Sequence, residues 1–575
     1  MTDHHLPRSD PSLAGPFALE SQTLGALPVI DHFLTRMDIP VLLAGHLPPA
    51  GPRTTIQAAS VIGVLIRNLC IEREPLYGLA GWAGRFEPGA LGLGAGEGRM
   101  LNDDRVGRAL DELFDADRGS LLTGVVLHAV RAFDVDCGQL HNDSTSIVLH
   151  GNYGGADGRE RSGKPTVIAA RGHSKDHRPD LKQLVLILTV TADGALPICH
   201  RLAAGNTNDD RTHIQTWDEL RVLTGRSGFL YVADCKLCTH EQMQHIDSHG
   251  GRFVTVLPRT RKEDRVLRDW TWTDQPAWTE AARRPGKRNG DPDEIWRTCP
   301  APIRSGEGYR IVWVHSTQKH RLDQQARHDQ LTRAASALAD LNTRLHGDRC
   351  RFHDRATVQT AADAALKKRN CTRLLNVTIS ERTETRIRYE SRGENREPRQ
   401  RTFTWQRFTI TWEIDPHALA LNAAADGCFP LITNDQQLTD QQLLRAYRYQ
   451  PNLEKRHHQL KTVQHAAPIT LKSPSRIEAL LCCQFIALLC CCMIERELRT
   501  AMTHAHITEL PLYPEHRSCT APTATRVFDH LAPLQRHHLT HQHQTVQTFE
   551  PQLTPLQTHL LDLLNVPATA YTNNN

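Results

Sequence analysis

Three acidic residues stand in sequence surroundings that suit metal-dependent chemistry on phosphate esters. Asp143 lies inside an apolar, strand-like segment, Asp234 ends another one, and Glu454 lies in the aromatic and basic segment AYRYQPNLEKRHHQLK, residues 446–461. Hard cations such as Mg²⁺ prefer oxygen ligands in near-octahedral geometry. Two such ions about 4 Å apart can activate a water or hydroxyl and stabilise the leaving oxygen of a phosphodiester. Because converging carboxylates repel each other, a site made of all three favours a bound cation.

The segment 446–461 adds groups that suit a phosphate chain. Tyr447, Glu454 and Lys461 are spaced seven residues apart, close to two helical turns, which predicts one common face. Pro451 is expected to begin a helical segment with Glu454 in its first turn. Lys461 and the Gln450 amide suit phosphate oxygens, and Tyr447 suits stacking on a displaced base.

The elements that must position these residues form an α/β pattern. Strands are expected at 137–151, at 228–236 ending near Asp234, and at 252–258, and 183–203 reads as two strands joined at Asp193-Gly194. Helices are expected at 209–223 and 239–250. The order β-β-β-α-β-α-β predicts a mixed sheet in which a hairpin leads into crossover units.

The pattern predicts several domains. Their order is as follows: a helical amino-terminal region at 1–130; the first part of an α/β domain at 131–258; a β-rich insertion at 259–425; the rest of the α/β domain at 426–505; and a polar, partly flexible tail at 506–575.

Composition restricts the class of protein. The chain has 575 residues, 39% of them apolar and 23% charged, and a net charge of +4, which fits a globular protein with room for local basic patches. The amino terminus lacks the basic start and apolar core of a signal peptide. The apolar run at 479–494, rich in cysteine, is shorter than a membrane span and predicts a buried core helix in a reducing, cytoplasmic setting.

The sequence resembles the DDE insertion-sequence transposases, in the subgroup with a β-strand insertion before the last acid and a Y-R-E-K signature. The three acids match in HNDSTSIVLHGNY, FLYVADCKLCT and YRYQPNLEKRHHQLK, and the resemblance covers about 130–500. GHSKDHRPDLKQLVL and LAAGNTNDDRTH also match. Tyr447, Glu454 and Lys461 fit the signature, and Gln450 stands at its arginine position. Three nearby cations could supply that phosphate contact instead: Arg448, Lys455 or Arg456.

The resemblance implies a ribonuclease-H-like catalytic domain, with helices on both faces of a mixed sheet. This domain would be formed by 131–258 and 426–505, and the region 1–130 would take part in binding DNA ends. It implies a transposase that binds the ends of its own element, cuts there with Mg²⁺ and joins the freed 3′-hydroxyls to target DNA. Asp143, Asp234 and Glu454 would be the catalytic and metal-binding residues, holding two Mg²⁺ ions for which Mn²⁺ can substitute. The implied partners are double-stranded DNA and a second copy of the chain in the DNA complex, with no membrane.

Other interpretations stay open at this stage. Taken singly, each acid is a surface or capping residue more often than a catalytic one. The basic connection around 173–182 is either a solvated loop or a DNA backbone contact, and the arginine-rich strands at 382–407 are either a salt-bridged face or a DNA cleft. Two other functions fit the same residues: a ribonuclease-H-like nuclease without strand transfer, and a catalytically dead DNA-binding derivative.

Overall fold

In the computed structural model, the chain divides into two compact units, each described separately here. The first comprises Met1–Phe253 and Ala446–Asn575, and the second Val254–Arg445. The structure describes residues 17–49, 51, 56–286, 288, 290–347, 350–390, 399–464, 466, 471–542 and 544–572. The five parts expected from the sequence remain a prediction, and the structure divides the chain into these two units instead.

The first unit contains a mixed sheet built mainly from buried apolar strands. Its order is β6-β5-β2-β7, with β2 antiparallel to β5 and parallel to β7. The strands are β2 (Gln139–Leu149), β5 (Lys182–Thr191), β6 (Pro197–Ala204) and β7 (Leu230–Ala233). The predicted hairpin joins β5 to β6, and its turn places Gly194 at φ +76°, a value that glycine adopts without strain. The mixed α/β class expected from the sequence is confirmed.

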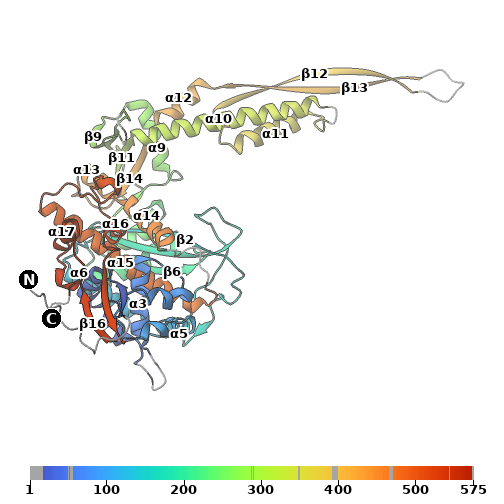
Figure 1. Cartoon of the computed structure of the whole chain (residues 1–575). Coiled ribbons are helices and arrows are strands. Elements are labelled where there is room, and N and C mark those ends of the chain that lie inside the picture. The colour runs from blue at the N-terminus through green and yellow to red at the C-terminus, as the bar shows by residue number, and fades with distance from the viewer. Residues whose placement is uncertain are drawn as a thin grey trace, which may run out of the picture. The chain divides into compact units, whose positions relative to one another are not determined.

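Helices make up most of the rest of the first unit (Figure 1). They are α1 (Leu27–Arg36), α2 (Ile39–His46), α3 (Ala58–Ile71), α4 (Leu79–Ala83), α5 (Asp103–Asp115), α6 (Arg118–Ala132), α7 (His213–Thr224), α8 (His240–Ser248), α14 (Gln450–His458), α15 (Pro474–His504), α16 (Ala524–Leu531) and α17 (Pro555–Leu563). Helix α15 has the length and mean hydropathy, 2.4, of a membrane span, yet 89% of that apolar window is buried inside the protein. It is a core helix, packed against α3 and α5, as the run at 479–494 predicted.

The two ends of the chain meet in a small sheet, and here the sequence interpretation differs from the structure. Strand β15 (Gln535–His541) lies between β1 (Phe17–Thr23) and β16 (Gln544–Phe549). The buried guanidinium of Arg536 pairs with Glu87 and Glu550. Residues 506–575 are therefore largely structured, not a loose tail, because their polar side chains find partners far away in the sequence.

The second unit combines an antiparallel sheet with a long two-stranded ribbon. The sheet has the order β8-β14-β11-β10-β9, and β12 and β13 form the ribbon. The elements are β8 (Arg252–Val256), α9 (Lys262–Asp274), β9 (Thr279–Arg284), β10 (Glu294–Pro300), β11 (Arg310–Ser316), α10 (Thr317–His346), α11 (Arg355–Lys367), β12 (Leu375–Glu390), β13 (Arg399–Ile414), α12 (Pro416–Ala424), β14 (Cys428–Thr433) and α13 (Asp440–Tyr447).

One end of the ribbon is anchored in a hydrophobic cluster. Ile379, Phe408 and Ile410 are buried against apolar side chains of α10 and α11, among them Leu338 and Val358. The rest of the ribbon continues beyond these two helices (Figure 1). The strand character expected for the arginine-rich segment is thus confirmed.

Candidate functional site

Strand pairing brings the first two acids together. Strands β2 and β7 are parallel, and Asn142 pairs with Ala233. Asp143 and Asp234 each follow one residue later, so they occupy equivalent places on neighbouring strands. Because such strands lie about 4.8 Å apart, the two Cα atoms should be separated by roughly 5 Å. Two acids 91 residues apart in the sequence therefore lie side by side at the end of β7.

The surroundings of Asp143 combine burial with positive charge. Its side chain is 23% exposed, and its Oδ1 accepts a hydrogen bond from Lys175 Nζ at 3.2 Å. The same ammonium reaches the Ser144 carbonyl and, at 3.2 Å, the Ser144 hydroxyl. Burial raises the pKa of Asp143 to about 6; Lys175 opposes this rise, and the Asp234 charge adds to it. The influence of Asp234 on this pKa shows that the two carboxylates act on each other electrostatically.

Asp234 also has a local structural role. Its side chain caps a short 3₁₀ helix, Cys235–Leu237, by accepting a hydrogen bond from the Lys236 backbone at 3.0 Å. The preceding residues of β7, LYVA, are all buried. An apolar strand that ends in a capping aspartate therefore sets this carboxylate at the margin of the core, where it is half-buried.

Glu454 is placed by a helix that begins at Pro451. Helix α13 ends at Tyr447, and α14 starts at Gln450 with Pro451 in its first turn, as predicted. Lys461 falls in a π-helical turn, Gln459–Val463, so the seven-residue spacing does not run along one regular helix. Glu454 is exposed on α14.

Tyr447 links Glu454 to the aspartates electrostatically. Burial raises the pKa of Tyr447 to about 12, and the charges of Asp234, Cys235 and Glu454 add to this rise. Asp234 and Glu454 therefore both act on the Tyr447 phenol. A phenol that stays neutral near several carboxylates is consistent with the stacking role expected from the sequence.

Gln450 is bonded to the strand that carries Asp143. Its Oε1 accepts a hydrogen bond from His141 Nδ1 at 2.9 Å, and its Nε2 donates to the Asn142 carbonyl at 3.2 Å. Gln139 Nε2 lies 2.8 Å from His141 Nε2, so the neutral ring with its proton on Nδ1 satisfies both neighbours. In this structure the amide at the signature's arginine position holds α14 against β2.

Two cations, Lys175 and Lys461, and the side chain of His457 lie along β2. Lys461 Nζ lies 2.6 Å from Asp176 Oδ1 and 3.5 Å from the Thr145 hydroxyl. His457 Nδ1 is 3.8 Å from Asp143 Oδ2. Burial, followed by the charges of Lys175 and Lys461, lowers the pKa of His457 to about 3. The histidine therefore stays neutral beside the carboxylate.

The three cations proposed as substitutes for the missing arginine lie in different surroundings. Arg456 is buried, 2.7 Å from Glu495 of α15, and it also donates to the Ala195 and Gly194 carbonyls. Its guanidinium is thus used inside the protein, because it joins α14 to α15 and the β5–β6 turn. Lys455 is exposed and donates to Asn452 at 3.3 Å, and Arg448 is half-buried.

Lys175 and Asp176 lie at the site, although the sequence marked only a basic connection. That connection spreads its cations: Arg178 pairs with Asp180, and Lys182 donates to the Tyr153 carbonyl. Lys175 alone of these reaches Asp143. Lys175 lies in the motif GHSKDHRP, but in so long a loop the sequence does not show which lysine turns back to β2. His141 carried no signal of its own.

The donor set is chemically suited to a hard cation, since it offers carboxylate oxygens at two neighbouring positions. Within the described residues, however, no group of three or more His, Cys, Asp or Glu side chains is arranged to hold a metal ion. Asp143 and Asp234 are neighbours, but Glu454 does not share one coordination sphere with them. The Lys175 ammonium is paired with Asp143. Asp143 and Asp234 suit a divalent cation, because both offer carboxylate oxygens and the two residues are neighbours.

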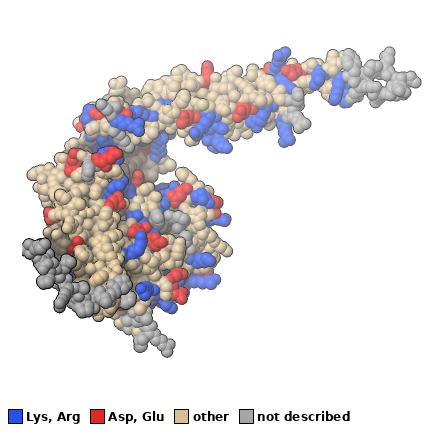
Figure 2. Space-filling view, viewed as in Figure 1, with Lys and Arg blue, Asp and Glu red and all other residues tan. Residues whose placement is uncertain are grey.

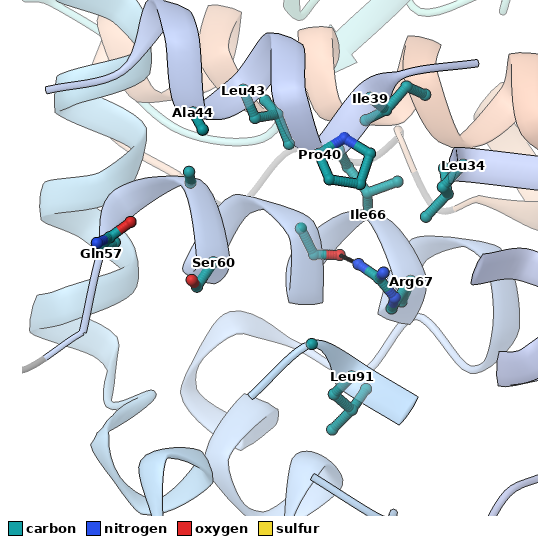
Figure 3. A pocket seen from close by; sticks show the side chains of 13 residues that line it. Leu34, Ile39, Pro40, Leu43, Ala44, Gln57, Ser60, Ile66, Arg67 and Leu91 are labelled. Atoms are coloured by element: carbon teal, nitrogen blue, oxygen red, sulfur yellow. Dashed lines mark hydrogen bonds between the residues drawn. The ribbon is translucent and has the colours of Figure 1, made fainter. Parts of the chain in front are cut away.

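A separate pocket lies among the amino-terminal helices. It has a volume of about 170 Å³, and its lining includes Leu34, Ile39, Leu43 and Ile66 (Figure 3). The one cation of its lining, Arg67, donates to the Gly63 carbonyl at 3.0 Å and pairs with Asp31. An apolar pocket whose cation is already paired does not suit a phosphate group, and none of the candidate acids lines it.

Comparisons with known proteins give two matches. A family described as a domain of unknown function, DUF4277, matches residues 19–127, the region from β1 into α6. No curated protein matches the chain. Among solved structures, the chain is similar to a piggyBac transposase synaptic complex with hairpin DNA, studied by cryo-EM. The identity is 10% and the TM-score 0.24, over 79% of this chain and 84% of that one. A TM-score this low carries no argument, and the function must be argued from the site.

Proposed function

We propose that this chain is a DDE transposase, which binds the ends of its own element, cuts them and joins them to target DNA. The observation that supports it most is the register of β2 and β7, which sets Asp143 beside Asp234. Glu454 approaches from α14, whose Gln450 is bonded to β2. The strand order β6-β5-β2-β7, with the first strand central, also fits a ribonuclease-H-like sheet.

In this proposal Asp143 and Asp234 hold the divalent cations, with Glu454 as a further ligand. Bound Mg²⁺ would activate the attacking water or 3′-hydroxyl and stabilise the leaving oxygen. The protein's own groups prepare the site. Lys175 neutralises Asp143 until a cation takes its place, and neutral His457 beside Asp143 adds no competing charge. In the same proposal Lys461 contacts a phosphate oxygen, and Tyr447 stacks on a displaced base.

Hydrolysis and joining would both be in-line phosphoryl transfers at this one site, with no covalent protein intermediate. Two element ends must be joined, so we propose a homodimer on double-stranded DNA, acting in the cytoplasm of a bacterial-type cell. We also propose that the chain belongs to the DDE insertion-sequence transposases and to their subgroup with the Y-R-E-K signature.

The test is a cutting and joining assay with the purified full chain. A labelled duplex carrying the DNA that flanks its gene is incubated with Mg²⁺ or Mn²⁺, and strands are resolved on a gel. We expect metal-dependent cuts at a defined end and joined products with wild type, and neither product with Asp143→Asn. Asp180→Asn is the matched control, since Asp180 is exposed and paired only with Arg178.

The other outcomes separate the rival functions. Cut but never joined strands would favour a nuclease without strand transfer. A shifted band that is not cut in either metal would favour a DNA-binding derivative, a function that Gln450 in the arginine position would also fit.

A further inference from the structure

The ribbon of the second unit carries its arginines on one face. Residues directly opposite each other across β12 and β13 share a face, and the faces alternate along each strand. Arg388 pairs with Arg401, Arg386 with Phe403, and Arg382 with Arg407. These registers place all of them on the same side. We call Arg382, Arg386, Arg388, Arg401 and Phe403 the arginine face.

The opposite side of the ribbon is nearly uncharged. Near its anchored end it carries Ile379, Phe408 and Ile410, which are buried on α10 and α11. Farther along it carries Thr383 and Thr385, and then Ile387 opposite Thr402. Glu381 also lies on this side, and Glu384 lies on the arginine face between Arg382 and Arg386. The exposed arginines are nevertheless confined to one side of the described ribbon.

A fifth arginine of the same side, Arg407, is paired inside the protein. Arg407 lies at the base, where it pairs with Glu384 at 3.4 Å and donates to the Leu345 and Gly347 carbonyls. In the described part of the chain, Arg382, Arg386 and Arg388 are exposed and make no ion pair. Of the two readings left open by the sequence, a salt-bridged face does not describe these three residues.

An exposed aromatic ring lies among these arginines. Arg401 lies over the ring of Phe403, with 5.4 Å between its guanidinium carbon and the ring centroid. Phe403 remains 40% exposed. A polyanion bound over this face would contact the guanidinium groups and cover the ring.

We propose that the arginine face binds duplex DNA, with the ribbon in the major groove and its guanidinium groups on the phosphates. The major groove, about 12 Å wide, admits a two-stranded ribbon. Arg382 to Arg388 span about 20 Å, or about six base pairs. Figure 2 shows Lys and Arg side chains along the ribbon and its neighbouring helices. The inference rests on the proposed function only in taking DNA as the polyanion.

The test compares two variants of the full chain with equal changes of charge. The ribbon variant carries Arg382→Gln, Arg386→Gln, Arg388→Gln and Arg401→Gln. The control carries Arg321→Gln, Arg333→Gln, Arg355→Gln and Arg373→Gln, four exposed arginines of the same unit. Binding to a duplex of about three helical turns is measured by fluorescence anisotropy over a series of salt concentrations, without divalent metal. Thermal unfolding verifies that both variants fold.

Counterion release sets the expected size of the effect. Each lost phosphate contact lowers the salt slope by about 0.9. With an unchanged affinity at 1 M salt, losing two to four contacts weakens binding in 0.1 M salt by about 60-fold to 4,000-fold. We expect this loss for the ribbon variant and a much smaller one for the control.

Other results would overturn the inference. Equal weakening of both variants would mean general electrostatics, and unchanged binding by the ribbon variant would mean that the face does not touch DNA. Loss of binding to an RNA duplex with DNA binding intact would assign the face to RNA instead. If the wild type itself binds no duplex DNA, the proposed function fails; if it binds and the ribbon variant binds equally, only this inference fails.

Discussion

Gln450 offers the sharpest single-residue test, because the signature and the structure assign it different roles. The signature predicts a phosphate contact at this position. The structure instead shows an amide whose Oε1 and Nε2 are bonded to His141 and to the Asn142 carbonyl. Replacing Gln450 by Ala removes both hydrogen bonds and leaves a buried His141 N–H without an acceptor.

The size of the effect follows from these contacts. Two hydrogen bonds contribute about 1 kcal/mol each, and a buried donor left unsatisfied costs about 1–3 kcal/mol. We therefore expect Gln450→Ala to lower the free energy of unfolding by about 2–4 kcal/mol. At up to about 2 °C per kcal/mol for a unit of this size, the melting temperature should fall by roughly 4–8 °C.

The assay is thermal unfolding of the full chain beside a surface control. The control is Asn452→Ala, since Asn452 lies on α14 and its side chain accepts a hydrogen bond from exposed Lys455. The control should change the melting temperature by about 1 °C or less. Combining Gln450→Leu with His141→Phe should cost less than the sum of the single changes, because the two side chains are partners. An unchanged melting temperature together with a weaker DNA affinity would refute the structural role and restore the phosphate contact.

Three further predictions concern α14 and the residues next to it. Lys461→Ala should weaken DNA binding and reduce its salt slope by about 0.9; an unchanged slope would remove Lys461 from the phosphate site. Burial lowers the pKa of His141 from 6.5 to about 4, so the unfolded chain takes up this proton first as pH falls. The stability linked to His141 is complete above pH 6.5 and is lost toward pH 4, amounting to about 2 kcal/mol at pH 5; melting curves of wild type and His141→Gln at pH 5 and 8 should show the difference shrink in the variant. Arg456→Met should cost up to about 3 kcal/mol, because it removes the nearer of the two arginines on the buried Glu495 carboxylate and leaves Arg499 at 3.5 Å, whereas exposed Lys455→Met should cost about 0.5 kcal/mol or less; equal effects in urea unfolding would contradict the buried ion pair.

Local patterns in the sequence predicted the elements that carry the acids. The strand-like segment at 137–151 and the apolar run before Asp234 predicted β2 and β7, and Pro451 predicted the start of α14. These signals are local, since they depend on neighbouring side chains and on the fixed φ of proline.

Contacts between distant residues could not be predicted in this way. The bonds from Gln450 to His141 and Asn142 join residues more than 300 positions apart. The pairing of β1 with β15 joins the two ends of the chain, so the polar sequence after 506 was interpreted as a tail. The heptad spacing from Tyr447 to Lys461 failed as a single face because the helix is interrupted before Gln450 and widens to a π turn at Gln459–Val463.

The central claim is that Asp143 and Asp234 hold a divalent cation with Glu454. The most direct measurement is a crystal structure of the DNA complex grown with Mn²⁺, using anomalous scattering to locate the ion. We predict an ion between the Asp143 and Asp234 carboxylates at about 2.0–2.2 Å from their oxygens, with Lys175 Nζ displaced from Asp143 and Glu454 drawn in. An Mn²⁺-saturated complex with no ion between these carboxylates, and with Lys175 still on Asp143, would contradict the claim.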